Sequence, residues 1–321
     1  MSIISQDLNA LFKEVYRDKV ENLVPEGIQL LKDIPFSEKE KVGRNLQVAV
    51  RVDEDSPFTF TNDAVSAVAL SEPVPARYLN ATITPTTIVL RAQISYQQAA
   101  KAVAKKKSIE DGTKEILDSL KLSMDRKLED AFFNGSRDIL DNDGNVTGST
   151  LLGLNQLLTT TGTLYGINKN DSSGRWAPKT YAAGGKLTVA KVQACAQLAV
   201  PAGLEGDVNL YINTAAYNAL ARELTKNIHD GPGPLMVPYS KGFVIVKPSL
   251  YVRLATGFLV KSGNCKRIGT TDVTFDVPGF KDQGPFHRME SNNGFTVTLY
   301  TEQALFIAKP AQCVRLTGIT A

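Results

Sequence analysis

Two stretches of this sequence could in principle bind a phosphate or a metal ion. The first is Gly184-Gly185-Lys186, the nearest approach to a phosphate-binding loop. A Walker A loop also needs a glycine where Thr180 stands. It further needs a serine or threonine after the lysine, where Leu187 stands, because that hydroxyl binds magnesium. Since both positions fail, the segment predicts a turn and no ATPase.

The second stretch, Asp138 to Asn145, resembles a calcium loop only in composition. Aligned on Gly144, an EF-hand would have its first ligand at Ile139 and its bidentate glutamate at Thr150. Neither side chain is a carboxylate. The stretch therefore predicts a solvated turn in which Asp and Asn side chains bond to their own backbone.

Histidine and cysteine chemistry has little to build on. The chain has two histidines, His229 and His287, and three cysteines without a Cys-x-x-Cys pair. Zinc sites and histidine-dependent catalysis need such residues in clusters. A carboxylate pair assembled from distant residues stays open, but we expect no enzyme, no catalytic residue, no metal and no cofactor. The cysteines are expected to be buried, reduced thiols: Cys195, Cys265 and Cys313.

Two runs of opposite charge favour contacts between protein surfaces. Asp53-Glu54-Asp55 is acidic, and a lysine cluster spans 101–107. The net charge of +3 is too small for a broad nucleic-acid-binding field, so any contact with DNA is weak and non-specific. We favour a salt bridge between the lysines and the acidic run of a neighbouring copy, with DNA contact as the alternative. The candidate inter-subunit contacts are Arg51, Asp53, Glu54, Asp55, Arg77, Lys101, Lys105, Lys106 and Lys107.

The elements that position these charges begin with a strand, because apolar and polar residues alternate over 45–52. The same period returns over 88–96, and we expect the two strands to pair. The intervening prolines forbid a long helix there, and the acidic run forbids a buried turn. Residues 43–97 therefore predict one long projecting hairpin. An isolated two-stranded hairpin is marginally stable in water, so this one should rest on another molecule.

A long helix follows the lysine cluster. Ser108 is its expected N-cap, Leu117, Leu120, Met124 and Leu128 form its apolar stripe, and Asn134-Gly135 its left-handed stop. A helix is also expected over 5–31, a short helix or strand over 151–158, and a loop over 162–186 anchored by Trp176. The remaining expected elements are helices at 187–200 and 214–226, strands at 208–212, 243–246 and 257–260, and a closing hairpin of 295–299 with 304–308.

This order of elements resembles the Hong Kong 97 type of tailed-phage major capsid protein along nearly the whole chain. The segments that strengthen the resemblance are 124–136 (MDRKLEDAFFNGS), 151–155 (LLGLN) and 210–213 (LYIN), followed by Ala216, Tyr217 and Leu220.

The resemblance implies an α+β fold with four parts. These are an N-terminal arm (1–42), an extended β-hairpin called the E-loop (43–97), a peripheral domain with a spine helix and antiparallel sheet (98–160 and 275–321, spine 108–134), and a central A-domain of mixed α/β structure (161–274, with loop 162–186). It also implies that the hairpin lies over an adjacent subunit.

The same resemblance implies a structural role in the virion, assembled in the host cytoplasm. Copies of the chain would form hexamers and pentamers of an icosahedral shell around double-stranded DNA. A scaffolding protein, a portal at one vertex and a decoration protein are the other expected partners, and no segment is apolar enough to suggest a membrane. The alternatives are another self-assembling shell, tail or sheath protein, and a soluble enzyme with 162–186 as its lid.

Overall fold

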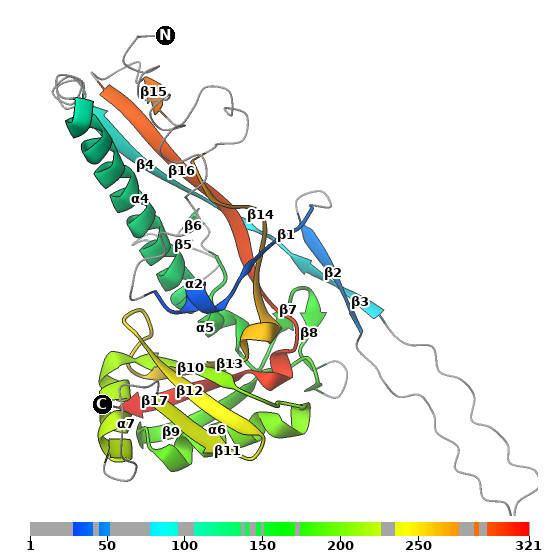
Figure 1. Cartoon of the computed structure of the whole chain (residues 1–321). Coiled ribbons are helices and arrows are strands. Elements are labelled where there is room, and N and C mark those ends of the chain that lie inside the picture. Colours follow the sequence, from blue (N-terminus) through cyan, green and yellow to red (C-terminus); the bar gives the residue numbers. More distant parts are fainter. Residues whose placement is uncertain are drawn as a thin grey trace, which may run out of the picture.

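The computed structural model describes residues 28–40, 45–51, 78–95, 106–135, 139–140, 146–148, 151–170, 174–225, 235–275, 286–288 and 294–320. Their backbone forms two sheets, each with helices against it, and a two-stranded ribbon that extends away from both (Figure 1). The expected helix over 5–31 lies outside the described residues except at its end, where α2 (Leu30–Asp33) forms one turn.

The first sheet is organised by one long strand, β16 (Gly294–Ile307). Its partners are β4 (Thr86–Ser95) along one edge, and β14 (Cys265–Thr274) and β15 (Phe286–Arg288) along the other. The short β1 (Phe36–Glu38) adds in parallel to β14. The expected hairpin of 295–299 with 304–308 is therefore wrong. Glu302 and Gln303 do not mark a turn, because both are buried within β16.

The expected pairing of 45–52 with 88–96 is also wrong. β2 (Leu46–Arg51) pairs with β3 (Tyr78–Ile83), and β4 pairs with β16 in the first sheet. Alternation shows that a strand has one buried face, but it does not say which strand lies beside it.

The long helix is α4 (Lys106–Asn134), and the expected stripe is buried at Leu117, Leu120, Met124 and Leu128. Figure 1 shows α4 running along β4 and β16. Two predictions about the ends of α4 are wrong. Ser108 lies inside the helix instead of capping it. Gly135 is not left-handed. A Cβ there would stand 2.0 Å from the Leu151 carbonyl oxygen, so this glycine permits close approach of the following segment.

That following segment holds α5 (Leu154–Leu157), one of the two alternatives expected there. It is followed by the small hairpin of β7 (Thr163–Leu164) and β8 (Ile167–Asn168). Trp176 is the expected anchor, since its Nε1 donates to the Leu164 carbonyl at 3.1 Å. A further pair, β5 (Ile139–Leu140) and β6 (Val146–Gly148), flanks the acidic turn, most of which lies outside the described residues.

The second sheet has the order β11-β12-β10-β13-β17-β9. The expected central elements are confirmed as α6 (Val189–Ala199), β10 (Val208–Asn213), α7 (Thr214–Thr225), β12 (Gly242–Ser249) and β13 (Thr256–Val260). The sheet also contains β11 (Leu235–Tyr239), β17 (Val314–Thr320) and β9 (Lys179–Lys186).

The loop expected over 162–186 is thus partly a strand of this sheet. Gly184 and Gly185, expected in a free turn, both have positive φ at a bulge between β9 and β17. The hairpin before it is buried at Leu164, Ile167 and Lys169. The described part of this segment is therefore held against the body and does not form the free lid that was expected.

The chain crosses between the sheets twice near its end. A single turn, η4 (Ser262–Asn264), leads from β13 into β14, and another, η6 (Pro310–Gln312), leads from β16 into β17. Residues 265–274, which fall in the range expected for the central part, pair in the first sheet, and residues 314–320, in the range expected for the peripheral part, pair in the second. Such short turns give no sequence signal of a change of sheet. Among the helices described, none is long and apolar enough to cross a membrane.

We predict that Gly135→Ala lowers the stability of the subunit by more than about 2 kcal/mol, because the added methyl group meets backbone on two sides. Urea unfolding of the unassembled subunit measures this. Gly263→Ala is the matched control, because nothing lies within 4 Å of a Cβ there. Equal stability of the two variants would contradict the close-approach role.

Candidate assembly surfaces

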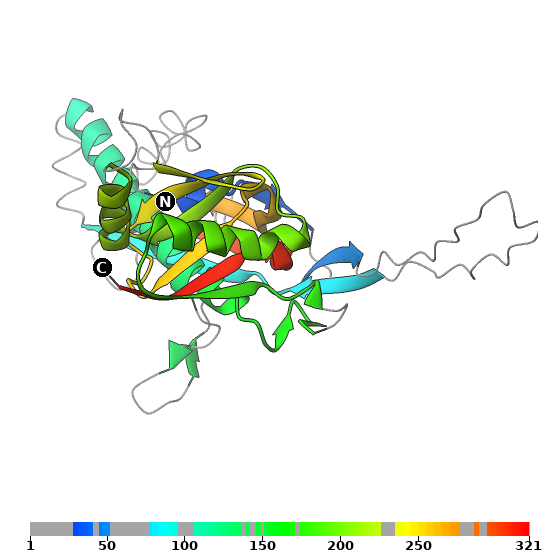
Figure 2. The same cartoon turned by 90° about the horizontal axis from the view of Figure 1, so that it is seen from below.

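The ribbon of β2 and β3 is the first candidate surface. Its base is held in the body, where Leu46, Ala81 and Ile83 are buried. Farther out the side chains are only half-buried or exposed, and Tyr78 at the far end is 64% exposed. Figures 1 and 2 both show the two strands extending away from the rest of the molecule. Within the described residues each strand forms a ladder only with the other, and Val48, Val50 and Leu79 are only partly buried against the core, so the outer part of the ribbon is incompletely covered by its own chain.

The structure places few of the expected contact residues. Arg51 is exposed at the outer end of β2, opposite Tyr78. Lys106 and Lys107 are the first two residues of α4, and their side chains are not described. The other expected contacts lie outside the described residues: Asp53, Glu54, Asp55, Arg77, Lys101 and Lys105. The salt bridge between copies therefore stays a prediction. His229 also lies outside, and His287 lies in β15 opposite Thr296.

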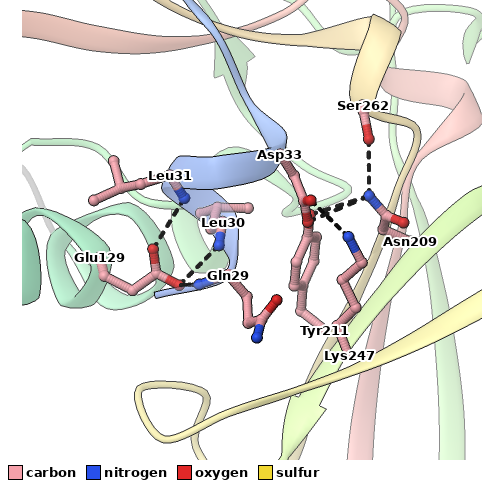
Figure 3. A network of polar contacts seen from close by, with 9 residues as sticks. All are labelled: Gln29, Leu30, Leu31, Asp33, Glu129, Asn209, Tyr211, Lys247 and Ser262. Carbon is pink, nitrogen blue, oxygen red and sulfur yellow. Dashed lines mark hydrogen bonds and ion pairs between the residues drawn. The ribbon is translucent and has the colours of Figure 1, made fainter. Parts of the chain in front are cut away.

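Residues 28–38, which lead into the ribbon, form a clasp between the two sheets. The start of α2 sits on the carboxylate of Glu129, which projects from α4 (Figure 3). Oε1 accepts the backbone N–H groups of Gln29 and Leu30 at 3.2 and 2.9 Å, and Oε2 accepts that of Leu31 at 3.1 Å. These are N–H groups that a first helical turn cannot satisfy itself, so Glu129 takes the place of a cap.

The other end of α2 is fixed to the second sheet through Asp33. Its carboxylate accepts the Tyr211 hydroxyl at 2.5 Å and pairs with the Lys247 ammonium at 2.6 Å, and Asn209 Nδ2 lies 3.5 Å away. Figure 3 shows Glu129 and Asp33 at opposite ends of the same short helix. One turn of helix therefore joins the spine helix to β10 and β12.

Arg267 of β14 holds the next part of the clasp. Its Nε donates to the Ile34 carbonyl at 2.8 Å, and its backbone N–H donates to the Pro35 carbonyl at 3.2 Å. Its guanidinium also stands over the Phe36 ring, 5.9 Å from the centroid. The clasp thus touches α4, the first sheet and the second sheet within eleven residues.

The face of α4 toward the clasp carries three buried charged residues, Lys121, Asp125 and Glu129. They recur every four residues, which places them in one row beside the apolar stripe. The sequence analysis did not single out these charges. Their spacing could have identified them from the sequence. Each directly follows a residue of the apolar stripe, so each lies at the border of the buried face of α4.

Burial dominates the electrostatics of this row. It raises the pKa of Asp125 to about 6, against the opposing effect of the Lys121 and Arg267 charges. Asp272 of β14 adds a smaller upward effect. Burial also raises the pKa of Glu129, although its three backbone hydrogen bonds oppose the shift. One oxygen of Asp125, Oδ2, is buried without a hydrogen-bond partner, so its charge is a net cost to folding.

We predict that Asp125→Asn stabilises the subunit at pH 8 by up to roughly 3 kcal/mol. Because the pKa of Asp125 is raised on folding, the wild-type carboxylate destabilises most above pH 6, and protonation relieves the cost as the pH falls toward about 4. The gain from the substitution should shrink over the same range. Urea unfolding at several pH values measures it. A gain that is the same at pH 4 and pH 8 would argue against a buried charge.

We predict that Asp33→Asn costs about 1–3 kcal/mol, because Lys247 loses its anion and the Tyr211 hydroxyl its strongest acceptor. Tyr211→Phe should cost less. The two substitutions combined should cost less than their sum, since both break the same hydrogen bond. Urea unfolding of the wild type, the two single variants and the double variant gives the four free energies of unfolding that this double-mutant cycle needs. Strict additivity would show that the Asp33–Tyr211 contact contributes nothing.

Comparison with solved structures shows which fold these elements make. The capsid asymmetric unit of cyanophage A-1(L) matches with a TM-score of 0.66 at 13% identity, covering 96% of this chain and 98% of the other. A protein of Mycobacterium phage Adephagia matches with a TM-score of 0.57 at 11% identity, covering 100% and 98%. An encapsulin complex from Synechococcus elongatus matches with a TM-score of 0.54 at 11% identity, covering 94% and 90%.

No protein-family model and no curated protein matches the sequence. The similarity therefore lies in the arrangement of the elements, and it extends over nearly the full length of both chains in each pair. The chain has the Hong Kong 97-like capsid fold.

Proposed function

We propose that this chain is the major capsid protein of a tailed bacteriophage. The observation that carries the proposal is the match to a cyanophage capsid subunit over 96% of this chain and 98% of that one. Because the match spans nearly all of both chains, one architecture accounts for the arrangement of the described residues. In this arrangement the first sheet and α4 form the peripheral domain, and the second sheet, α6 and α7 form the central domain.

The ribbon supports the proposal on physical grounds. A pair of strands that leaves the body with half-exposed apolar residues gains cover when it lies on a neighbouring copy. Contacts of this kind join one patch to a different patch, so they close into rings when the rotation between copies allows it. Each contact can be modest, because one subunit would engage several neighbours at once.

The proposed function implies a particular assembly, location and set of partners. Hexamers and pentamers would close into an icosahedral shell in the virion, with double-stranded DNA inside. A net charge of +3 suits weak, non-specific contact with that DNA. A scaffolding protein, a portal at one vertex and a decoration protein are the further partners we propose.

A shell that encloses protein instead of DNA is the second candidate, favoured by the match to an encapsulin complex. Particles made by this chain in cells lacking other phage proteins distinguish the two. A compartment shell would enclose a co-purifying protein cargo. A phage shell would be empty or hold only incidental nucleic acid.

We predict that the purified chain forms closed particles visible by negative-stain electron microscopy, and that lysine substitutions at Asp53, Glu54 and Asp55 prevent them. The reason is repulsion between the altered run and the lysines at 101–107 of the next copy. Glutamate substitutions at Lys101, Lys105, Lys106 and Lys107, added to the first set, should restore assembly by restoring opposite charges. Undiminished assembly of the first variant would refute the salt bridge, and a monomeric wild type would refute the shell.

A further inference from the structure

A loop at one end of the second sheet holds apolar side chains out into solvent. It follows β12 and spans residues 250–255. Leu250 is 79% exposed and Leu254 is 42% exposed, and Arg253 between them is also exposed. We call Leu250, Arg253 and Leu254 the knob.

The loop that carries the knob is firmly held. Asn134 Nδ2, at the end of α4, donates to the Tyr251 carbonyl at 2.6 Å. Asn213 Nδ2 donates to the Val252 carbonyl at 2.8 Å. Val252 is buried between these anchors. The exposure of Leu250 is therefore built into an anchored loop, and a leucine exposed at a fixed position is suited to a partner.

A hollow lies at the outer edge of the same sheet, between α6 and β11. Its volume is about 490 Å³. The residues that line it, which we call the socket, are Gln193, Ala194, Gln197, Pro238, Tyr239 and Ser240.

The socket is uncharged and is flanked by exposed apolar side chains. All six lining residues are uncharged, and the exposed Leu198, Met236 and Phe243 lie on the same elements or beside them. Loss of charge together with aromatic and methionine side chains distinguishes the centre of a protein interface from ordinary surface.

The β11 edge beside the socket is closed to an added strand. Pro238 has no backbone N–H to offer, and its carbonyl already accepts Gln193 Nε2 at 2.9 Å. Tyr239 donates its hydroxyl to the Gly206 carbonyl at 2.7 Å. A partner would therefore enter the socket with side chains and not by extending the sheet.

The knob and the socket cannot meet within one chain. Phe243 is the second residue of β12 and lies beside the socket, and Leu250 follows the end of β12, so the extended strand separates them by roughly 23 Å. Glu205 and Asp207 lie near Tyr239 and offer carboxylates to Arg253 of the knob, while Lys241, next to Ser240, also brings a positive charge to this rim. Lys261 also lies near this rim, but its ammonium donates to the Glu205 carbonyl at 2.6 Å.

We propose that the knob of one copy enters the socket of the next, so that this head-to-tail contact repeats around a ring of central domains. The inference rests on the proposed shell function and names the surfaces of that assembly. Leu250 and Leu254 fill the hollow, while Arg253 lies against Glu205 and Asp207 at its rim. Because the two surfaces differ, the contact propagates from copy to copy instead of ending at a dimer.

The first test uses one variant of each surface. Leu250→Asp places a charge on the knob, and Ala194→Trp fills the socket from an exposed helix position. Each should raise the concentration needed for particle formation by about tenfold or more, as expected at the centre of an interface. Val89→Asp, at a similarly exposed apolar position on β4, is the control and should assemble as the wild type does.

The second test does not depend on loss of assembly. Leu250→Cys and Gln197→Cys are combined in one chain and treated with a short bismaleimide in assembled particles. The double variant should give a ladder of cross-linked copies, whereas a mixture of the two single variants should stop at cross-linked pairs. The native cysteines are buried and should give no ladder in the wild type.

The outcomes separate the two proposals. Normal assembly of both Leu250→Asp and Ala194→Trp, or assembled double-cysteine particles without a ladder, would overturn the knob and socket and leave the shell function standing. A wild-type chain that never forms particles would overturn the shell function, and this contact with it.

Discussion

One turn of helix holds the two halves of this molecule together. The carboxylate of Glu129 satisfies three N–H groups at the start of α2, and the carboxylate of Asp33 near its end takes the Tyr211 hydroxyl and the Lys247 ammonium. Such charge-assisted bonds are about twice as strong as neutral ones. They also tolerate little rotation, so the angle between the spine helix and the second sheet is set by two carboxylates.

The apolar packing beneath the clasp reinforces the same joint. Phe133 at the end of α4 stacks with Phe258 of β13 and meets Tyr211 of β10 edge-on, with centroids 5.8 and 5.6 Å apart. The core under the first sheet thus continues onto one face of the second sheet. A separate core lies on the opposite face, under α6 and α7.

This construction suits a subunit that must present several surfaces at fixed angles. Errors in direction accumulate when copies repeat around a closed shell, and a rigid joint limits them. Burying carboxylates on this face of α4 costs free energy, as the raised pKa values of Asp125 and Glu129 show. The apolar stripe of α4 and the two cores offset that cost.

The sequence by itself determined the elements whose own residues specify them: the spine helix from its apolar stripe, and α6, β10, α7, β12 and β13 from local period and flanking turns. The order of those elements was enough to indicate the capsid fold. The partners of strands were decided only in three dimensions, because alternation in 46–51 and 86–95 is the same whichever strand lies alongside. The joint made by Glu129 and Asp33 could not be predicted from the sequence for a related reason. Glu129 and Asp33 look like ordinary surface charges until the fold brings segments about a hundred residues or more apart into contact, and only burial turns those charges into the bonds that fix the shape.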